Sequence, residues 1–134
     1  RVMSHPAAGR VTSLILALAL GAGSLAYVGL KYGPHVVDSR RVRALISEAG
    51  QRAATFETDR EARRWFDRRA GEEGFGWLDS GDLYWQRVDR QTVHVGAGWT
   101  VQVHHVLVGE QALHFRWYCT ATVAGCAPFE PNWD

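Results

Sequence analysis

The sequence has little net charge, few cysteines and none of the short motifs that mark common active sites. Its 15 Lys and Arg residues nearly balance its 14 Asp and Glu residues, so the formal net charge is only +1. Bulk charge therefore gives no sign of a nucleic-acid partner. The sequence contains no GxSxG, HExxH or CxxCH motif and no phosphate-binding glycine-rich loop between a strand and a helix. We therefore expect a protein that is not an enzyme and has no catalytic residues and no cofactor.

The chain is nevertheless rich in residues that build a folded core. Of its 134 residues 46% are hydrophobic, and they include 6 Trp, 4 Tyr and 5 Phe. This composition excludes a disordered chain, because so many aromatic side chains can bury enough surface to offset the entropy of ordering. The length allows one small globular domain beside a membrane segment.

One long stretch near the N-terminus carries no charge. It runs from Val11 to Leu30, between Arg10 and Lys31. As a helix, it would be about 30 Å long, the thickness of the hydrocarbon core of a bilayer. A signal peptide has an apolar region of only about 7–15 residues, whereas this run continues past the small residues 22–24. The sequence therefore predicts a transmembrane helix over residues 11–30 that is retained.

The orientation of this helix rests on opposing signals. Basic residues just after the span favour a cytoplasmic C-terminal part, although that rule weakens for large domains. The two cysteines, Cys119 and Cys126, are close in sequence, and a disulfide between them would require an oxidising compartment. We therefore expect a single-pass membrane protein with its N-terminus inside and its head outside the cytoplasm.

Small residues recur at four-residue spacing along the span and just after it. Such spacing lets a second helix approach closely in lipid, although Gly and Ala are also common in membrane helices that pack against nothing. The predicted helix-packing pairs are Ala17 with Gly21, Ala19 with Gly23, Ala22 with Ala26, and Gly29 with Gly33.

Two further helical patterns follow the span. After Pro34, which predicts a kink or a new helix start, an apolar face at helical spacing extends as far as Ala54 and contains Val42, Leu45, Ile46 and Ala49. A capping box, Thr58 with Glu61, then opens a second helix that ends at Gly71. Its apolar side contains Ala62, Trp65, Phe66 and Ala70. The arginines on its other side predict a solvated face, with an anion-binding face as the alternative.

From Leu83 onward the hydrophobic period changes to two, which is typical of strands. The pattern predicts four antiparallel strands over residues 83–88, 91–95, 99–108 and 112–121, with turns at residues 89–90, 96–98 and 109–111. Alternation puts one set of residues on a common apolar face: Val93, Val95, Trp99, Val101, Val103, Leu107, Leu113, Phe115 and Trp117. The two helices would cover this face, so we predict an α+β fold.

The opposite face of the predicted sheet carries three histidines. His94, His104 and His114 lie there with Thr100, Gln102 and Arg116. Imidazole is the commonest metal ligand, so the three histidines are weak candidates for a metal site. A solvated face or a surface that docks a partner fits the same residues, and we assign no metal site. His105 falls on the apolar side, where we expect a core or edge residue.

The last residues carry few signals of secondary structure. We predict a disulfide between Cys119 and Cys126, with two free thiols as the alternative. Phe129 and Trp133 would need to pack on the head or on another subunit. The resulting division is an N-terminal tail (1–10), a transmembrane helix (11–30), an extracytoplasmic α+β head (31–122) and a C-terminal tail (123–134).

The order of these segments resembles a known family. A short basic N-terminus precedes a membrane helix running into residues 30–34, an amphipathic helix, a capped helix ending in residues 67–69 and a strand meander beginning at residues 83–85. This layout, over residues 11–117, resembles a family of small single-pass inner-membrane proteins of proteobacteria with a pilin-like N-terminal helix, a domain of unknown function. The cysteine-containing tail lies outside the resemblance. Type IV pilins also carry a Gly-Phe cleavage site before the apolar run and a glutamate five residues on, and this chain has neither there. The resemblance implies a topology, a single pass through the bacterial inner membrane that places the head in the periplasm, and no activity.

These observations lead to three hypotheses about function. The first is a non-catalytic accessory subunit, stabilising or assembling a larger bacterial membrane complex. Its partners would be integral membrane protein subunits and the lipid bilayer. The second is a pilin-like subunit that associates with copies of itself. The third is an extracytoplasmic sensor that binds a metal or ligand through the three histidines.

Overall fold

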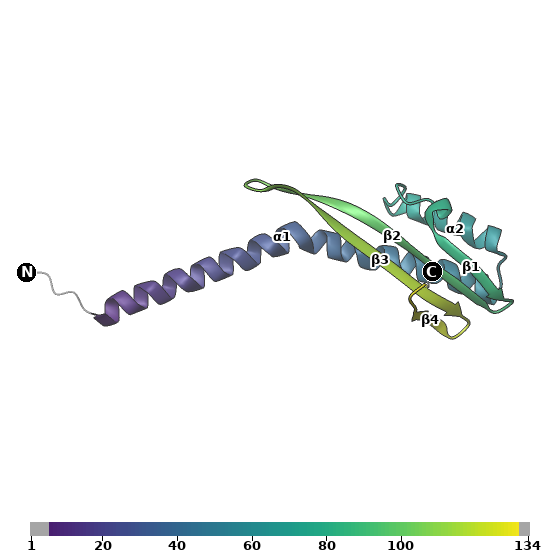
Figure 1. Cartoon of the computed structure of the whole chain (residues 1–134), viewed down its shortest axis with the longest axis horizontal. Helices are drawn as coiled ribbons and strands as arrows, with labels where there is room; N and C mark the ends of the chain where they lie inside the picture. The colour runs from purple at the N-terminus through teal and green to yellow at the C-terminus, as the bar shows by residue number, and fades with distance from the viewer. Residues whose placement is uncertain (1–5, 132–134) are drawn as a thin grey trace, which may run out of the picture. The chain divides into compact units, whose positions relative to one another are not determined.

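The computed structural model describes residues 6–131. Two helices are followed by a short 3-10 turn and four strands: α1 (Pro6–Thr55), α2 (Asp59–Glu72), β1 (Tyr84–Asp89), β2 (Thr92–His105), β3 (Gly109–Thr122) and β4 (Gly125–Pro128) (Figure 1). The strands form one antiparallel sheet in the order β1-β2-β3-β4. The predicted α+β class, with a helical N-terminal half and a four-stranded meander, is confirmed.

The chain divides into two compact units between Val36 and Val37. The first contains the apolar part of α1, and the second contains the rest of α1 and all later elements. This boundary lies a few residues after the predicted end of the membrane span. The helix continues through Pro34 rather than restarting there.

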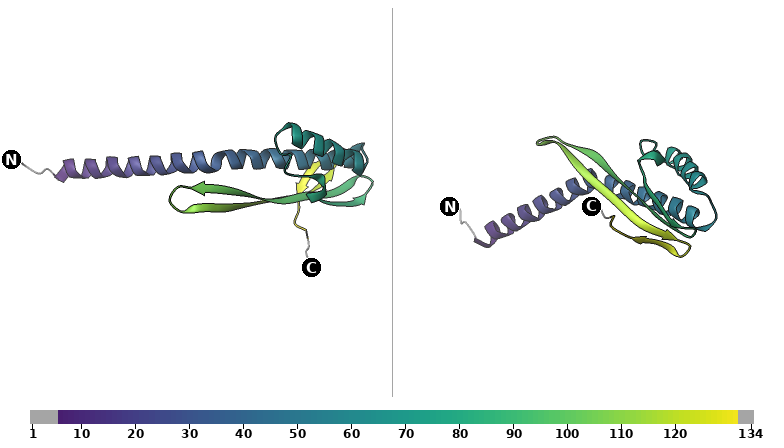
Figure 2. Two further views of the ribbon diagram at one scale, coloured as in Figure 1. Left: turned by 90° about the horizontal axis from the view of Figure 1, so that it is seen from above. Right: turned by 45° about the vertical axis from the view of Figure 1, so that its right-hand side comes forward.

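In the second unit, which we call the head, helices cover one face of the sheet (Figure 2). The predicted faces of both helices are buried: Val42, Leu45, Ile46 and Ala49 of α1, and Ala62, Phe66 and Ala70 of α2. They pack with the odd-numbered residues of β2, such as Val93 and Val95, in a single hydrophobic core. The prediction that the helices cover the apolar face of the sheet is confirmed.

The start of α2 is the one that the capping box predicts. Thr58 is extended, and its hydroxyl accepts a hydrogen bond from the backbone N–H of Glu61 at 3.2 Å. This bond satisfies one of the donors that a helix N-terminus leaves free. The helix ends one residue beyond the predicted Gly71, at Glu72.

The predicted turn at residues 96–98 is wrong, because β2 runs without a break through both glycines. Gly96 pairs with Tyr118, and a Cβ on Gly96 would lie only 2.5 Å from the Trp117 carbonyl oxygen. The glycine is there because the Tyr118 ring crosses the strand at this position. A glycine inside a strand often marks such a close approach.

Two further differences from the prediction concern the β2–β3 turn and the C-terminal tail. The β2–β3 turn lies at residues 106–108, so Gly109 begins β3 rather than the turn, and Leu107 is exposed in the turn instead of lying on the core face. The predicted C-terminal tail also contains β4, which pairs with the end of β3. Cys126 of β4 lies opposite Ala121 and forms a disulfide with Cys119, with a Cα–Cα distance of 5.4 Å. The predicted cysteine pairing is therefore present.

Candidate functional surface

The face of the sheet opposite the helices carries the residues that the sequence placed there. His94, Thr100, His104, His114 and Arg116 all lie on it, because their even-numbered positions alternate with the buried ones. Cross-strand pairing is His94 with Thr120, Thr100 with His114 and His104 with Glu110. The predicted parity of the long strands is correct on this face.

The three candidate histidines are not brought together. His94 and His104 are ten residues apart on β2, which corresponds to about 33 Å along a strand. His114 lies between them, where its Nδ1 is 3.0 Å from the Thr100 hydroxyl, while Nδ1 of His94 is 2.9 Å from the Thr120 hydroxyl. Within residues 6–131, no group of three His, Cys, Asp or Glu side chains could hold a metal ion. The hypothesis of a shared metal site finds no support in this geometry.

An aromatic cluster lies on this face near the start of β2, at the end of the sheet where β1 and β4 pair with the long strands. The sequence patterns did not predict it. Tyr84 and Tyr118 meet edge to face with ring centroids 5.8 Å apart. Phe129, just after β4, stacks on His94 at 4.2 Å and also touches Tyr84. The backbone N–H of Phe129 donates to the Tyr118 carbonyl at 3.0 Å. The cluster therefore fixes the chain after β4 on the sheet, as the sequence required for Phe129; Trp133 lies outside the described residues.

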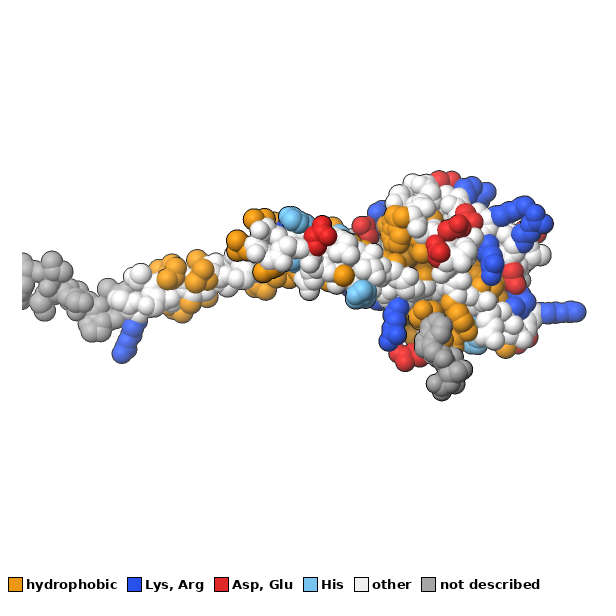
Figure 3. Space-filling model, turned by 45° about the horizontal axis from the view of Figure 1, so that its top comes forward, with side chains coloured by type: hydrophobic (Ala, Val, Ile, Leu, Met, Phe, Trp, Pro, Cys, Tyr) orange, Lys and Arg blue, Asp and Glu red, His pale blue; other side chains and the backbone are white. Residues whose placement is uncertain are grey.

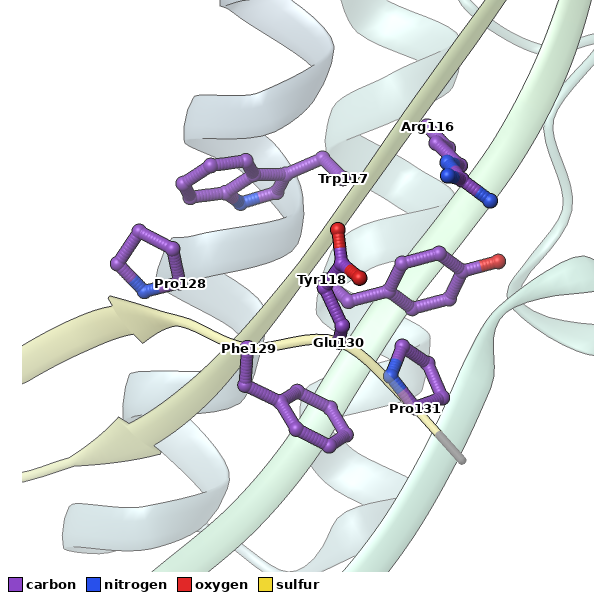
Figure 4. A pocket seen from close by; sticks show the side chains of 7 residues that line it. All are labelled: Arg116, Trp117, Tyr118, Pro128, Phe129, Glu130 and Pro131. Atoms are coloured by element: carbon purple, nitrogen blue, oxygen red, sulfur yellow. The ribbon is translucent and has the colours of Figure 1, made fainter. Parts of the chain in front are cut away.

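A pocket of about 530 Å³ opens beside this cluster (Figure 4). Its walls come from β3, from the last residue of β4 and from the chain that follows, and they are formed by Arg116, Trp117, Tyr118, Pro128, Phe129, Glu130 and Pro131. A second hollow of about 370 Å³ shares Arg116 and Tyr118 and continues along β2 and β3 past Gly98 to His114. Together they form a groove with aromatic and proline walls and both a cationic and an anionic side chain. Such a groove is suited to holding an extended segment or an aromatic side chain, and the Thr100 hydroxyl lies beside the His114 imidazole in its second hollow.

The serines of the head make structural contacts. The Ser47 hydroxyl accepts a hydrogen bond from the Trp117 indole at 3.3 Å and lies 3.9 Å from the Cys119 sulfur. The Ser80 hydroxyl donates to Asp67 at 2.7 Å. Neither contact places a histidine next to the hydroxyl, which is the arrangement that nucleophilic catalysis by serine needs.

Among the residues that the structure describes, the shortest ion pair is between Arg87 and Asp59, and Arg87 also contacts the end of α1. The Arg87 guanidinium donates to both oxygens of Asp59 at 2.5–3.1 Å, to the Ala53 carbonyl at the end of α1, and to two carbonyls of the β1–β2 turn. The hydrogen bond from Arg87 holds the pKa of Asp59 below its usual value. Because Asp59 is the first residue of α2, its charge also complements the helix dipole. This contact holds the helix junction against the sheet.

The first unit presents an apolar helical surface with no cover. Its leucines, including Leu14, Leu18, Leu20, Leu25 and Leu30, are all exposed. Blue and red side chains gather mostly on the head, and orange ones mark the preceding helix (Figure 3). The predicted helix-packing residues are exposed except Gly33, which is half-buried, and a Cβ added at Gly21, Gly23, Gly29 or Gly33 would meet nothing within 4 Å. The helix is long and apolar enough to cross a membrane, with none of its most apolar window buried.

Comparison with models of known protein families, with curated proteins and with solved structures finds no match.

Proposed function

We propose that the protein is a non-catalytic accessory subunit of a larger membrane complex, anchored by α1 in the bacterial inner membrane with its head in the periplasm. The observation that carries the proposal is the uncovered apolar half of α1. An uncharged helical surface of about 20 residues cannot remain exposed to water without associating, and a bilayer is the environment that fits its length. The disulfide between Cys119 and Cys126 supports a periplasmic head.

The partner is proposed to be another integral membrane protein that packs on the small-residue side of α1. In lipid, helices associate through close packing rather than through the hydrophobic effect, so open glycines and alanines favour contact. Three of the predicted pairs share this side, Ala19 with Gly23, Ala22 with Ala26, and Gly29 with Gly33, whereas Ala17 with Gly21 lies nearly opposite them. The groove on the outer face of the head, with its aromatic and proline walls, gives a second surface on which a neighbour could dock.

A pilin-like subunit that associates with itself is the second candidate. It is favoured by one observation: the unbroken 50-residue α1 has an apolar first part and a second part whose apolar face is buried under a four-stranded antiparallel sheet. In that arrangement the partners of α1 would be copies of the same helix.

Photo-crosslinking from two sides of the span tests the proposal. A photoreactive amino acid would replace Ile15, on the side that bears Ala19, Ala22 and Ala26, or Leu20, five residues on and therefore on nearly the opposite side. Both residues are exposed and both are large, so neither replacement fills a packed site.

We expect illumination of intact cells to give a discrete product between the Ile15 variant and a different membrane protein. The Leu20 variant should give mainly lipid adducts. Products that contain only copies of this chain would support the pilin-like alternative instead. Lipid adducts alone from both positions would overturn both hypotheses. Extraction of the unmodified chain by alkaline carbonate would contradict the membrane anchor itself.

A further inference from the structure

The turn between β2 and β3 consists of three successive apolar residues in solvent. Val106, Leu107 and Val108 are 81%, 95% and 80% exposed. Hairpin turns usually use Gly, Asn, Asp, Pro or Ser, whose backbone or side chain suits the turn. Here Gly109 alone supplies the left-handed conformation, with φ of +81°. Neither the core nor the turn geometry therefore requires the three apolar side chains, and a run of this kind marks an interaction surface.

The hairpin around this turn carries almost no charge. Between Trp99 and Phe115 the sequence has one formally charged residue, Glu110. Next to the turn, the His105 ring is buried and its Nε2 lies 3.1 Å from the Gln111 side-chain oxygen. A surface that enters a bilayer must be apolar at its tip and must have its nearby polar groups paired. The turn is apolar, and His105, the buried polar group beside it, is paired; the exposed carboxylate of Glu110, two residues after the turn, would stay at the level of the polar headgroups.

The contacts inside the head show in which direction the hairpin points. Gly50 of α1 faces Ala121 of β3, while Ser47 and Arg43, earlier in α1, both contact Trp117, earlier in β3. Moving back along α1 toward Val37 therefore means moving along β3 toward the turn. The turn lies at the end of the head where α1 enters it (Figure 2).

The hairpin also reaches beyond that end. From Trp117 to Leu107 the strand advances ten residues, or about 33 Å. From Arg43 to Val37 the helix advances six residues, or only about 9 Å. Because β2 and β3 run obliquely along this part of α1 and not at a right angle to it (Figure 1), the apolar turn projects past Val37.

The proposed membrane span ends close to the same point. Lys31, the first charge after the apolar run, is six residues before Val37. Six residues span at most about 22 Å in any conformation. The bilayer surface is therefore within reach of the end of the head from which the turn projects.

We propose that the Val106–Val108 turn inserts into the headgroup region of the bilayer that holds α1, so that the chain has a second lipid contact. This inference rests on the proposed membrane anchor. Its ligand is the apolar boundary of a lipid surface, and recognition requires no particular headgroup, because the turn itself carries no charge.

Depth measurements with a spin label test this proposal on the full chain. The two native cysteines form a disulfide, so a single introduced cysteine can be labelled. The test variant is Leu107→Cys. The matched control is Val123→Cys, an exposed apolar residue in the turn after β3, at the opposite end of that strand. Leu20→Cys reports on the span. Each labelled protein is reconstituted in vesicles of phosphatidylethanolamine and phosphatidylglycerol, and collisions with oxygen and with a water-soluble nickel complex are compared.

We expect the oxygen-to-nickel ratio at Leu107 to be several-fold higher than at Val123 and to approach that at Leu20. A ratio at Leu107 equal to that at Val123, with Leu20 in lipid, overturns the insertion and leaves the anchor intact. Protection of Leu107 from both reagents also overturns it, because protein rather than lipid would then cover the turn. An aqueous ratio at Leu20 overturns the anchor and the insertion together.

Discussion

Replacing Gly96 by alanine should destabilise the head, although the residue lies on the face of the sheet opposite the helices, where Tyr118 covers it. A new Cβ would lie 2.5 Å from the Trp117 carbonyl oxygen and 2.7 Å from Cγ of Tyr118. The first atom belongs to the backbone of β3, and the second is the root of a ring that cannot swing away without losing its contact with Tyr84. The substitution must therefore move the strand or break the aromatic cluster.

The magnitude follows from two opposing contributions. Adding a methyl group to a filled site costs about 1–3 kcal/mol. Removing a glycine from a strand returns about 0.5–1 kcal/mol, because the unfolded chain loses freedom. We expect Gly96→Ala to lower the free energy of unfolding by about 1–2 kcal/mol. For a domain of this size, this corresponds to a fall in Tm of roughly 5–15 °C.

Gly98→Ala is the matched control, two residues along the same strand and on the same face. There the new Cβ would meet its nearest neighbour, the Phe115 carbonyl oxygen, at 3.6 Å, which is ordinary contact. This variant should be as stable as the original chain or slightly more stable. Thermal unfolding in detergent, followed by near-ultraviolet circular dichroism of the aromatic residues, compares the two. If Gly96→Ala unfolds at the same temperature as Gly98→Ala, the Tyr118 ring and the Trp117 carbonyl do not restrict position 96 to glycine.

Two further predictions concern the contacts that hold the head together. Because Arg87 lowers the folded-state pKa of Asp59, the stability from this pair is present above the unfolded pKa of about 3.9 and is lost as the pH falls through the lower folded value. Asp59→Asn should therefore be less stable than the original chain at neutral pH and should approach it in acid, as measured by urea unfolding across that range; equal differences at all pH values would contradict this. Replacing both Cys119 and Cys126 by alanine should lower the free energy of unfolding by about 2–3 kcal/mol, because the disulfide closes a short loop. If the variant and the original chain have the same denaturant midpoint, and a reducing agent does not change the midpoint of the original chain, the disulfide does not form.

The helical half of the molecule could be predicted because its signals are local. The absence of charge between Arg10 and Lys31 defines one stretch of α1, and the apolar spacing from Val42 to Ala49 defines another. The start of α2 follows from a side chain and a backbone group three residues apart. In each case the residues that determine the element lie within it, so the sequence alone is sufficient.

The strand boundaries could not be predicted with the same certainty, because they depend on partners far away in sequence. Gly96 indicates a turn unless it is known that Tyr118 lies opposite it. The segment Gly125–Pro128 resembles an irregular tail until β3 offers an edge with which it can pair. The outer groove could not be predicted for the same reason. It forms only because β4 pairs with β3 and thereby places Phe129 against His94. The histidines were placed on the correct face but not at the correct distances, because alternation fixes the face of a residue and says nothing about clustering.

The two proposals together restrict how the head would present its outer face. A head held by one helix can turn about that helix, so the groove at Arg116, Tyr118 and Phe129 would have no fixed direction relative to the bilayer. A second lipid contact at Leu107 would remove this freedom, because two points of attachment leave only a narrow range of rotation. The faces of the sheet are fixed relative to the hairpin by the continuous pairing of β2 with β3. An inserted turn would therefore hold the groove at a constant orientation toward neighbouring proteins in the same membrane, and an accessory subunit needs such an orientation to dock on one of them.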